Sequence, residues 1–364
     1  MSATTAPIAR MPRAVARVWA KHLLCFAFPL LSLSFLLTGP HPWYVALLWL
    51  LPMPLVDWLD HKSGAARHEP VPDAPTAPFD AILYALVAIQ LLNVVLLGRL
   101  FAVQSLWSVD AVVALLLVGG NSGISGIVVA HELIHRREAR MRLLGRLLLC
   151  TVMYEHFYTE HVRGHHVRVG TRDDPATARF GEAFWPFLRR TIPGQFRSAW
   201  RLEAARLGDV DMPWWDPRMR RSRVVHGIVA EWTLALGLLA VFGTSAFLMF
   251  LAQAAYAILA LEQVNYFEHW GLERTERKVR PCDSWDTDSS FTLFALVGLS
   301  RHADHHAYAS RPFQQLRHWE ESPKLPTGYF AIGYYITFRN DLFQELMTKR
   351  LRERGLGPFA ATTE

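Results

Sequence analysis

Apolar and polar residues are segregated along this 364-residue chain into apolar runs separated by charged segments. Six runs are apolar enough to suggest membrane spans, at about residues 23–37, 43–56, 81–97, 111–130, 224–242 and 246–261. A helix of roughly 20 apolar residues crosses a bilayer. Pro29 falls inside the first run, and Pro52 and Pro54 make the end of the second irregular. The pattern predicts an all-α, polytopic membrane protein. Its bundle of about six transmembrane helices lies between residues 22 and 268, within a single domain over 1–364.

Three further segments carry local patterns. Small residues crowd the centre of the fourth run, Gly-Gly-Asn-Ser-Gly-Ile-Ser-Gly at 119–126, and such residues let helices pack closely in a bilayer. Residues 143–158 predict a helix that is too charged to span and that lies along the membrane interface. Residues 329–338 are apolar but too short to span, and the charged segment 196–222 predicts an excursion outside the bilayer core.

Positive charge gives the predicted bundle an orientation. Lys and Arg outnumber Asp and Glu by 38 to 32, and Arg99 is the only basic residue in the loops that would lie outside if the N-terminus is inside. Basic residues concentrate on the cytoplasmic side of membrane proteins. We therefore expect residues 131–223 and 269–364 to be cytoplasmic, in a protein of the cell's inner (cytoplasmic) membrane.

The three cysteines narrow the possible cofactors. Cys25, Cys150 and Cys282 lie far apart, and the chain contains no Cys-x-x-Cys pair. We therefore expect neither a fused iron–sulfur module nor a zinc ribbon, and no disulfide framework.

Histidines carry the candidate chemistry, because four short stretches hold nine of the sixteen. The nine are His131 and His135, then His161, His165 and His166, then His269, and finally His302, His305 and His306. Spacings of three and four residues place side chains on one face of a helix. Neutral imidazole is the commonest metal ligand and a four-coordinate site takes about four ligands, so nine candidates predict two metal ions.

Three kinds of function fit part of this pattern. His131-Glu132-x-x-His135 alone matches the motif of zinc metalloproteases, with Glu132 as the base, but it leaves seven clustered histidines unused. A metal transporter needs polar ligands within its spans, whereas these histidines gather at span ends and in loops. The third kind is a membrane oxygenase or desaturase with a histidine-ligated di-iron centre. Iron suits that chemistry because it changes redox state, which zinc does not.

Four longer motifs accompany the clusters. They are Asn265-Tyr-Phe-Glu-His269-Trp-Gly-Leu272, Asp174-Pro-Ala-Thr177, Gln315-Leu-Arg317 and Leu325-Pro-Thr-Gly-Tyr329. With the histidine clusters they resemble the membrane-bound alkane 1-monooxygenase family, within the wider membrane fatty-acid desaturase and hydroxylase superfamily. The resemblance covers about residues 45–330, and the histidine spacing alone is shared by the whole superfamily.

The resemblance implies a fold and an activity. The fold is a six-span bundle with a cytoplasmic, histidine-rich di-iron cap, in which the nine named histidines hold two iron ions. The activity is hydroxylation of the terminal carbon of an alkane or other alkyl chain, taken from the membrane, with O2 as co-substrate. Electrons would come from a separate rubredoxin or ferredoxin with its reductase. A fatty-acid or acyl desaturase or hydroxylase is the alternative, and no nucleic-acid partner is expected.

Residues near the clusters have expected roles as well. Six acids are expected to accept hydrogen bonds from ligand rings, or else to pair with arginines: Glu132, Glu160, Glu268, Asp173, Asp174 and Asp304. Six arginines are expected to form a docking face for an acidic electron donor: Arg136, Arg137, Arg140, Arg142, Arg163 and Arg168.

Trp49 is the expected gauge of substrate length. It lies eight residues before Asp57, hence roughly 12 Å inside the bilayer on a helix that rises 1.5 Å per residue. A bulky indole at that depth would close the far end of a substrate channel. The resemblance points the same way, because an alkane hydroxylase of that family has a tryptophan at the matching place. Simple packing of the indole is the alternative.

Overall fold

The computed structural model describes residues 11–72, 74–274 and 276–360. Within these residues the chain is helical, with two isolated β-bridges and no strand. The first half contains α1 (Arg13–His22), η2 (Leu23–Phe26), α2 (Ala27–Thr38), α3 (Trp43–Leu48), α4 (Pro52–Lys62), α5 (Ala77–Phe101), α6 (Val109–Ala114), η3 (Leu115–Gly119), η4 (Ser122–Val128), α7 (Val129–Ile134), α8 (Ala139–Cys150), α9 (Phe157–Glu160), η5 (His161–His165) and α10 (His166–Arg168). The second half contains α11 (Phe184–Arg206), η6 (Pro217–Arg221), α12 (Arg223–Phe242), α13 (Thr244–His269), η7 (Pro281–Asp283), α14 (Ser290–Ala295), α15 (His302–Ala307), η8 (Phe313–Gln315), α16 (Tyr329–Phe338), α17 (Asn340–Arg354) and η9 (Gly357–Phe359).

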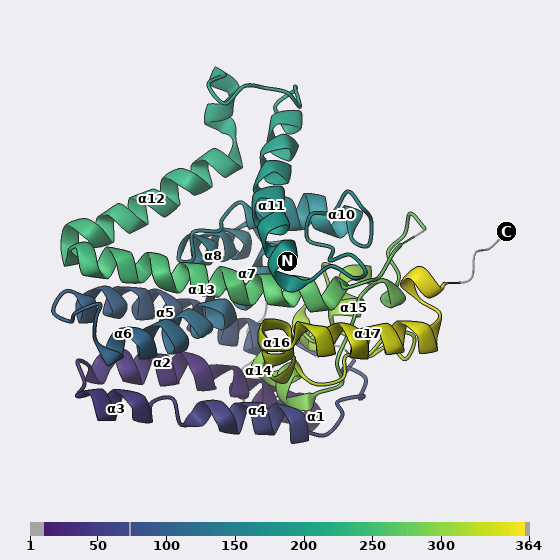
Figure 1. Cartoon of the computed structure of the whole chain (residues 1–364), viewed down its shortest axis with the longest axis horizontal. Coiled ribbons are helices and arrows are strands. Elements are labelled where there is room, and N and C mark those ends of the chain that lie inside the picture. The colour runs from purple at the N-terminus through teal and green to yellow at the C-terminus, as the bar shows by residue number, and fades with distance from the viewer. Residues whose placement is uncertain (1–10, 73, 275, 361–364) are drawn as a thin grey trace.

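Five helical stretches in the described residues are long and apolar enough to cross a membrane. They are Arg13–Thr38, Ala77–Phe101, Val109–Ile134, Arg223–Phe242 and Thr244–His269. They form a bundle in which α5 contacts α2, α12 and α13 (Figure 1). Gly243 alone joins α12 to α13, with φ of 86°, a left-handed conformation that glycine adopts without strain. The all-helical membrane fold predicted from the sequence is confirmed.

The predicted span at 43–56 is interrupted. The chain forms α3 and α4 instead. A turn at residues 49–51 separates them, and Pro52 is the first residue of α4. A proline ring clashes with the preceding helical turn and supplies no N–H, so the helix cannot continue through this point. The structure therefore has five long helices and one broken apolar segment, and the count of six spans is not confirmed.

The small-residue segment 119–126 forms wide, π-helical turns, η3 and η4, instead of a regular α-helix. A Cβ atom on Gly119 would lie 2.9 Å from the Cβ of Tyr256 in α13, so only glycine permits this approach. The predicted close packing is therefore present between this span and α13. The span continues into α7 and delivers His131 at its end.

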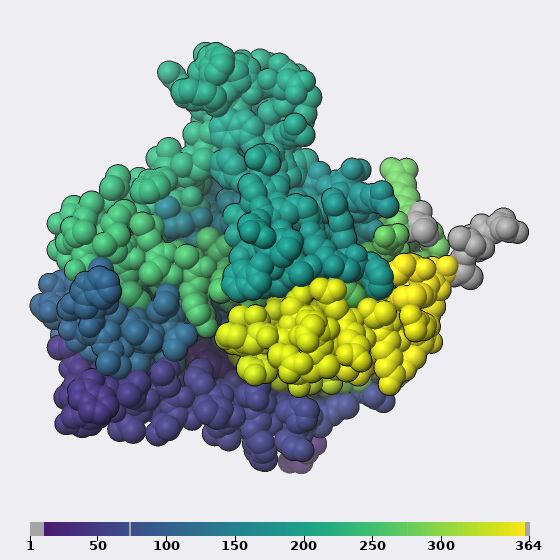
Figure 2. All heavy atoms as spheres, in the orientation of Figure 1, coloured from purple at the N-terminus to yellow at the C-terminus, as the bar shows by residue number. Residues whose placement is uncertain are grey.

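The remaining helices cover one end of the bundle. α11 and the Arg223 end of α12 form an arm that projects from the body, and η6 lies at its tip (Figures 1 and 2). Residues 143–158, predicted as one helix, are divided between the end of α8, a turn and the start of α9. The apolar segment 329–338 is α16, which packs with α17 against the end of α13 that carries His269.

Candidate metal centre

The nine clustered histidines converge into two groups. His131, His135, His161, His166 and His305 form the five-histidine group, and His165, His269, His302 and His306 form the four-histidine group. Within each group, one nitrogen from every ring lies within 4.8 Å of the others. The groups are adjacent, because the rings of His166 and His306 stack with centroids 4.3 Å apart. Each group therefore has the dimensions of a metal site.

Helical spacing explains most of this division. His131 lies in α7 and His135 follows it by four residues, so both rings point the same way into the five-histidine group. In α15, His302 and His306 share the i, i+4 face and join the four-histidine group. His305 is rotated off that face and reaches the other group. One six-residue helix thereby supplies both groups.

The second cluster depends on a wide turn. η5 is π-helical, so residues five apart stack upon each other, as residues four apart do in an α-helix. The Nε2 atoms of His161 and His166, five residues apart, lie 3.0 Å from each other in the five-histidine group. His165 points to the four-histidine group instead.

The chemistry of the rings fits a metal. Seven of the nine have a buried nitrogen without a hydrogen-bond partner among the described residues, and buried nitrogens in proteins normally have one. These seven are His131, His135, His165, His166, His269, His302 and His306. Burial, and then the neighbouring histidines, hold the pKa of His166, His305 and His306 well below its usual value. These rings are therefore neutral at pH 7, which is the form that binds a metal.

Two of the six predicted acids contact a histidine, and both serve the four-histidine group. Oδ2 of Asp174 lies 2.9 Å from Nδ1 of His165, and Oε2 of Glu268 lies 3.1 Å from Nε2 of His302. Both carboxylates are almost completely buried. A carboxylate in contact with a ligand ring fixes the orientation of the ring and raises its basicity.

The other four acids have different partners. Glu132 accepts from Nε of Arg136 at 2.7 Å and from the backbone N–H of Phe313. Glu160 pairs with Arg168, and Asp304 pairs with Arg311 and accepts from the indole of Trp319. Asp173 is exposed. The alternative role, pairing with arginine, is therefore the one that the structure gives to Glu132, Glu160 and Asp304.

The predicted donor-docking arginines also divide. Arg136 is buried between Glu132 and Asp80, so its expected place on a docking face is wrong. Arg142 is half-buried and donates to the backbone carbonyls of Arg136 and Arg137, while Arg168 is half-buried beside Glu160. The three that remain on the surface are Arg137, Arg140 and Arg163.

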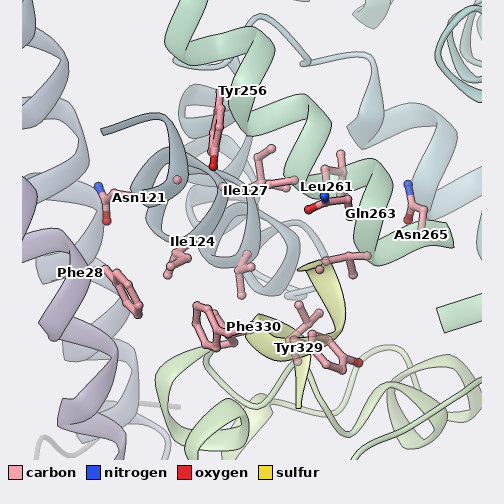
Figure 3. Close-up of a pocket in the computed structure, with 18 of the residues that line it drawn as sticks. Phe28, Asn121, Ile124, Ile127, Tyr256, Leu261, Gln263, Asn265, Tyr329 and Phe330 are labelled. Atoms are coloured by element: carbon pink, nitrogen blue, oxygen red, sulfur yellow. The ribbon is translucent and has the colours of Figure 1, made fainter. Parts of the chain in front are cut away.

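An apolar cavity of about 410 Å³ leads from the histidines into the bundle. His131 and His161 of one group and His302 of the other line its inner end. Phe28, Ile124, Ile127 and Leu261 line it farther out, as Figure 3 shows. The cavity continues along α13 to Tyr256, thirteen residues before His269 and so roughly 20 Å from the end of that helix.

Trp49 does not line this cavity. Its indole packs against Phe35 and His41, with ring centroids 6.0 and 5.9 Å away. The break after α3 places Trp49 in the turn, and the residue of α4 that reaches the cavity is Met53. The expectation that Trp49 closes the channel is therefore corrected, and the alternative of simple packing describes it.

Sequence reasoning gave no role to the polar groups of the cavity wall. Asn121, Gln263 and Asn265 line the cavity, but their amides are directed to Gln90, Thr337 and Glu262. Tyr329 also lines it and donates to Glu268 at 2.6 Å. An apolar helix face interrupted by single Asn, Gln or Tyr residues was the available signal, since a polar group inside a bilayer needs a partner.

Comparison with known proteins identifies the family. Residues 105–335 match the fatty acid desaturase family model. The alkane 1-monooxygenase 2 of Pseudomonas aeruginosa is 36% identical over 85% of this chain and 84% of its own length. The alkane 1-monooxygenase 1 of Alcanivorax borkumensis is 31% identical over 92% of this chain and 85% of its own length. This chain belongs to the alkane 1-monooxygenase family. The alkane 1-monooxygenase 1 of P. aeruginosa is 40% identical over 59% of this chain and 57% of that protein.

Membership confirms the resemblance seen in the motifs. The protein is an oxidoreductase of the membrane desaturase and hydroxylase superfamily. It is also an integral membrane protein, since five of its helices can span a bilayer and its relatives cover most of the chain. Family membership sets aside the zinc metalloprotease, which left seven clustered histidines unused, and the metal transporter, which needs polar ligands within its spans.

Proposed function

We propose that this protein hydroxylates the terminal carbon of an alkane or similar alkyl chain at two iron ions held by its two histidine groups. The overall reaction consumes one O2, two electrons and two protons, and it yields a 1-alkanol and water. The observation that carries the proposal is the apolar cavity that ends at both histidine groups. An alkyl chain lying in it would have one end beside His131, His161 and His302.

The cavity lining favours an uncharged substrate. Among the described residues that line it there is no lysine or arginine, and Glu268 is the only acid. A fatty acid that entered carboxylate first would therefore find no basic side chain along the wall to pair with its charge. An alkyl chain gains from burial in such a cavity, and the apolar wall keeps bulk water away from the reacting carbon.

Iron is the metal that we assign, because oxygenation needs an ion that binds oxygen and changes its redox state, and imidazole suits iron. When bound, it would supply the oxygen chemistry. The chain's own residues supply the nine imidazoles, hold two of the rings through Asp174 and Glu268, and place the alkyl chain.

Electrons would come from a separate rubredoxin or ferredoxin. Both half-buried rings of the metal centre, His135 and His166, belong to the five-histidine group. Arg137 and Arg140 come two and five residues after His135 in the chain, and Arg163 lies in the turn that carries the second cluster. We infer that an acidic donor docks on these three arginines. The distribution of basic residues supports a cytoplasmic face for this surface and an inner-membrane location.

Product analysis tests the proposed reaction. The full-length protein is reconstituted in vesicles with iron, rubredoxin or ferredoxin, the reductase and O2. Alkanes, fatty acids and acyl esters of matched chain length are then supplied, and we expect a 1-alkanol from the alkanes. An olefin as the main product would assign the protein to the desaturases. Full activity with zinc in place of iron would contradict the di-iron proposal.

Substrate length tests the cavity. Tyr256→Ala removes the ring at the far end and should extend the accepted chain length by several carbons. Trp49→Ser, outside the lining, should leave the chain-length profile unchanged. Gas chromatography of the alkanols formed from an alkane series measures both, and a shift in Trp49→Ser without one in Tyr256→Ala would reverse the assignment.

A further inference from the structure

The start of α16 is fixed by one buried carboxylate from another part of the chain. Oδ2 of Asp60, in α4, accepts the backbone N–H groups of Phe330 at 2.9 Å and Ala331 at 3.3 Å. Oδ1 of the same residue accepts the hydroxyls of Ser289 and Thr292, each at 2.6 Å. Asp60 is 2% exposed and so lies within the protein. These bonds join α4, α14 and α16 at a single point.

Tyr329 is the first residue of α16, and its position depends on the same point. Its backbone N–H donates to the hydroxyl of Thr292 at 3.1 Å, and Thr292 in turn donates to Asp60. Its side chain lines the cavity near Phe330 (Figure 3). Its hydroxyl points the other way, toward α13, and donates to Oε1 of Glu268 at 2.6 Å. The aromatic ring therefore forms part of the cavity wall, and its hydroxyl contacts the metal centre through Glu268.

Glu268 needs such a partner. It is a carboxylate with 1% exposure that forms no ion pair with lysine or arginine in the described part of the chain. Its two side-chain contacts there are the Tyr329 hydroxyl on Oε1 and the His302 ring on Oε2. A hydrogen bond from a neighbouring hydroxyl satisfies one of its buried oxygens and fixes the rotation of the carboxyl group.

We propose that Tyr329 is a positioning residue for the four-histidine group: it holds the Glu268 carboxylate against His302, and Asp60 holds the helix that carries Tyr329. The proposal rests on the proposed function in assuming that the group binds a metal. Partners of this kind typically change metal affinity 10–100-fold when they are removed. The expected effect is selective, because nothing in this series of contacts reaches the five-histidine group.

Tyr329→Phe is the decisive variant, because it removes one hydroxyl and keeps the ring. Tyr335→Phe is the matched control: it lies on the same helix, and its hydroxyl has no hydrogen bond among the described residues. Full-length proteins in detergent are titrated with Co²⁺, whose absorption reports each site, and then loaded with iron for Mössbauer spectroscopy. We expect Tyr329→Phe to weaken one site about 10–100-fold and to change one of two iron components. Tyr335→Phe should match the wild type.

Two results would overturn the proposal. One is wild-type affinity and spectra in Tyr329→Phe, and the other is an equal loss at both sites. If Tyr329→Phe does not accumulate, Glu268→Gln replaces it, since the amide keeps the shape of the side chain and removes one acceptor oxygen, and the same selective weakening is expected. Failure of the proposed function is a separate result: a wild-type protein that binds Co²⁺ at both sites but forms no alkanol would refute alkane hydroxylation and leave the role of Tyr329 open to this test.

Discussion

The two histidine groups differ in what surrounds them. All rings of the four-histidine group are buried, and two of them contact buried carboxylates, Asp174 and Glu268. The five-histidine group has two half-buried rings, His135 and His166, and no contact with a carboxylate among the described residues. The four-histidine group has two acids in contact with its rings, and the five-histidine group has a fifth imidazole and access to the surface.

This difference implies that the two sites have different roles, one in setting the properties of its metal and the other in access from the surface. A buried acid orients the ring that it contacts, so Asp174 and Glu268 would adjust the affinity and the electronic properties of one metal. Half-buried rings shorten the path from the surface to the other metal. The cavity reaches both groups, so a bound alkyl chain would lie beside the buried four-histidine site and the more accessible five-histidine site at once.

Removal of one ring from each group has the largest expected effect. His135→Ala and His306→Ala should each lower bound iron from about two to about one per chain, because each site loses a ligand. Alkanol formation should fall to background in both variants. Elemental analysis and product assays measure these values, and His226→Ala, an exposed histidine outside both groups, is the control. Activity that survives either change would show that one group alone is sufficient.

Loss of a carboxylate should affect one group only. Asp174→Asn removes the charge beside His165 and should weaken the four-histidine site about 10–100-fold, with the five-histidine site unchanged. Asp173→Asn is the matched control, since the neighbouring acid is exposed and touches no histidine ring in the described part of the chain. Co²⁺ titration distinguishes the sites. Equal weakening of both would remove the distinction drawn between them.

Charge reversal near the accessible group should have the smallest effect. Arg140→Glu should raise the apparent KM for the electron donor roughly threefold to tenfold at low salt, because complementary charge speeds association. The effect should shrink as salt rises, since exposed charges are screened. Arg220→Glu, at the tip of the arm in η6, is the control for net charge. A salt-independent KM in the wild type would argue against docking on these arginines.

The membrane fold and the nine histidines could be predicted because each depends on local pattern. Runs of apolar residues predict spans, and spacings of three or four residues predict shared helix faces. Pro52 also marks the break, although the apolar run around it predicts one span with an irregular end. The division of the rings between two groups could not be predicted, because α-helical spacing does not apply in the wide turn of η5.

The roles of charged and aromatic neighbours were less accessible from the sequence. Glu132 and Glu268 both lie beside histidines in the chain, yet one turns to Arg136 and the other to His302. The sequence predicts Arg136 on the docking face for the electron donor, but it is buried in an ion pair with Asp80 of a distant span. The sequence places Trp49 at the depth expected of a residue that closes the substrate channel. In the structure it lies in the turn after α3, and its indole packs against Phe35. These outcomes depend on contacts between segments far apart in sequence.

The wide turn of η5 makes the metal centre sensitive to residue count. His161 and His166 meet because five residues complete one turn there. Deletion of Val162, a half-buried residue between them, would keep every histidine and every acid. It would also leave the two rings four residues apart, a spacing that brings them together only if the segment became α-helical. The number of residues and the type of helix are therefore coupled in this segment: five residues pair the two rings in a π-turn, and four would pair them only in an α-turn.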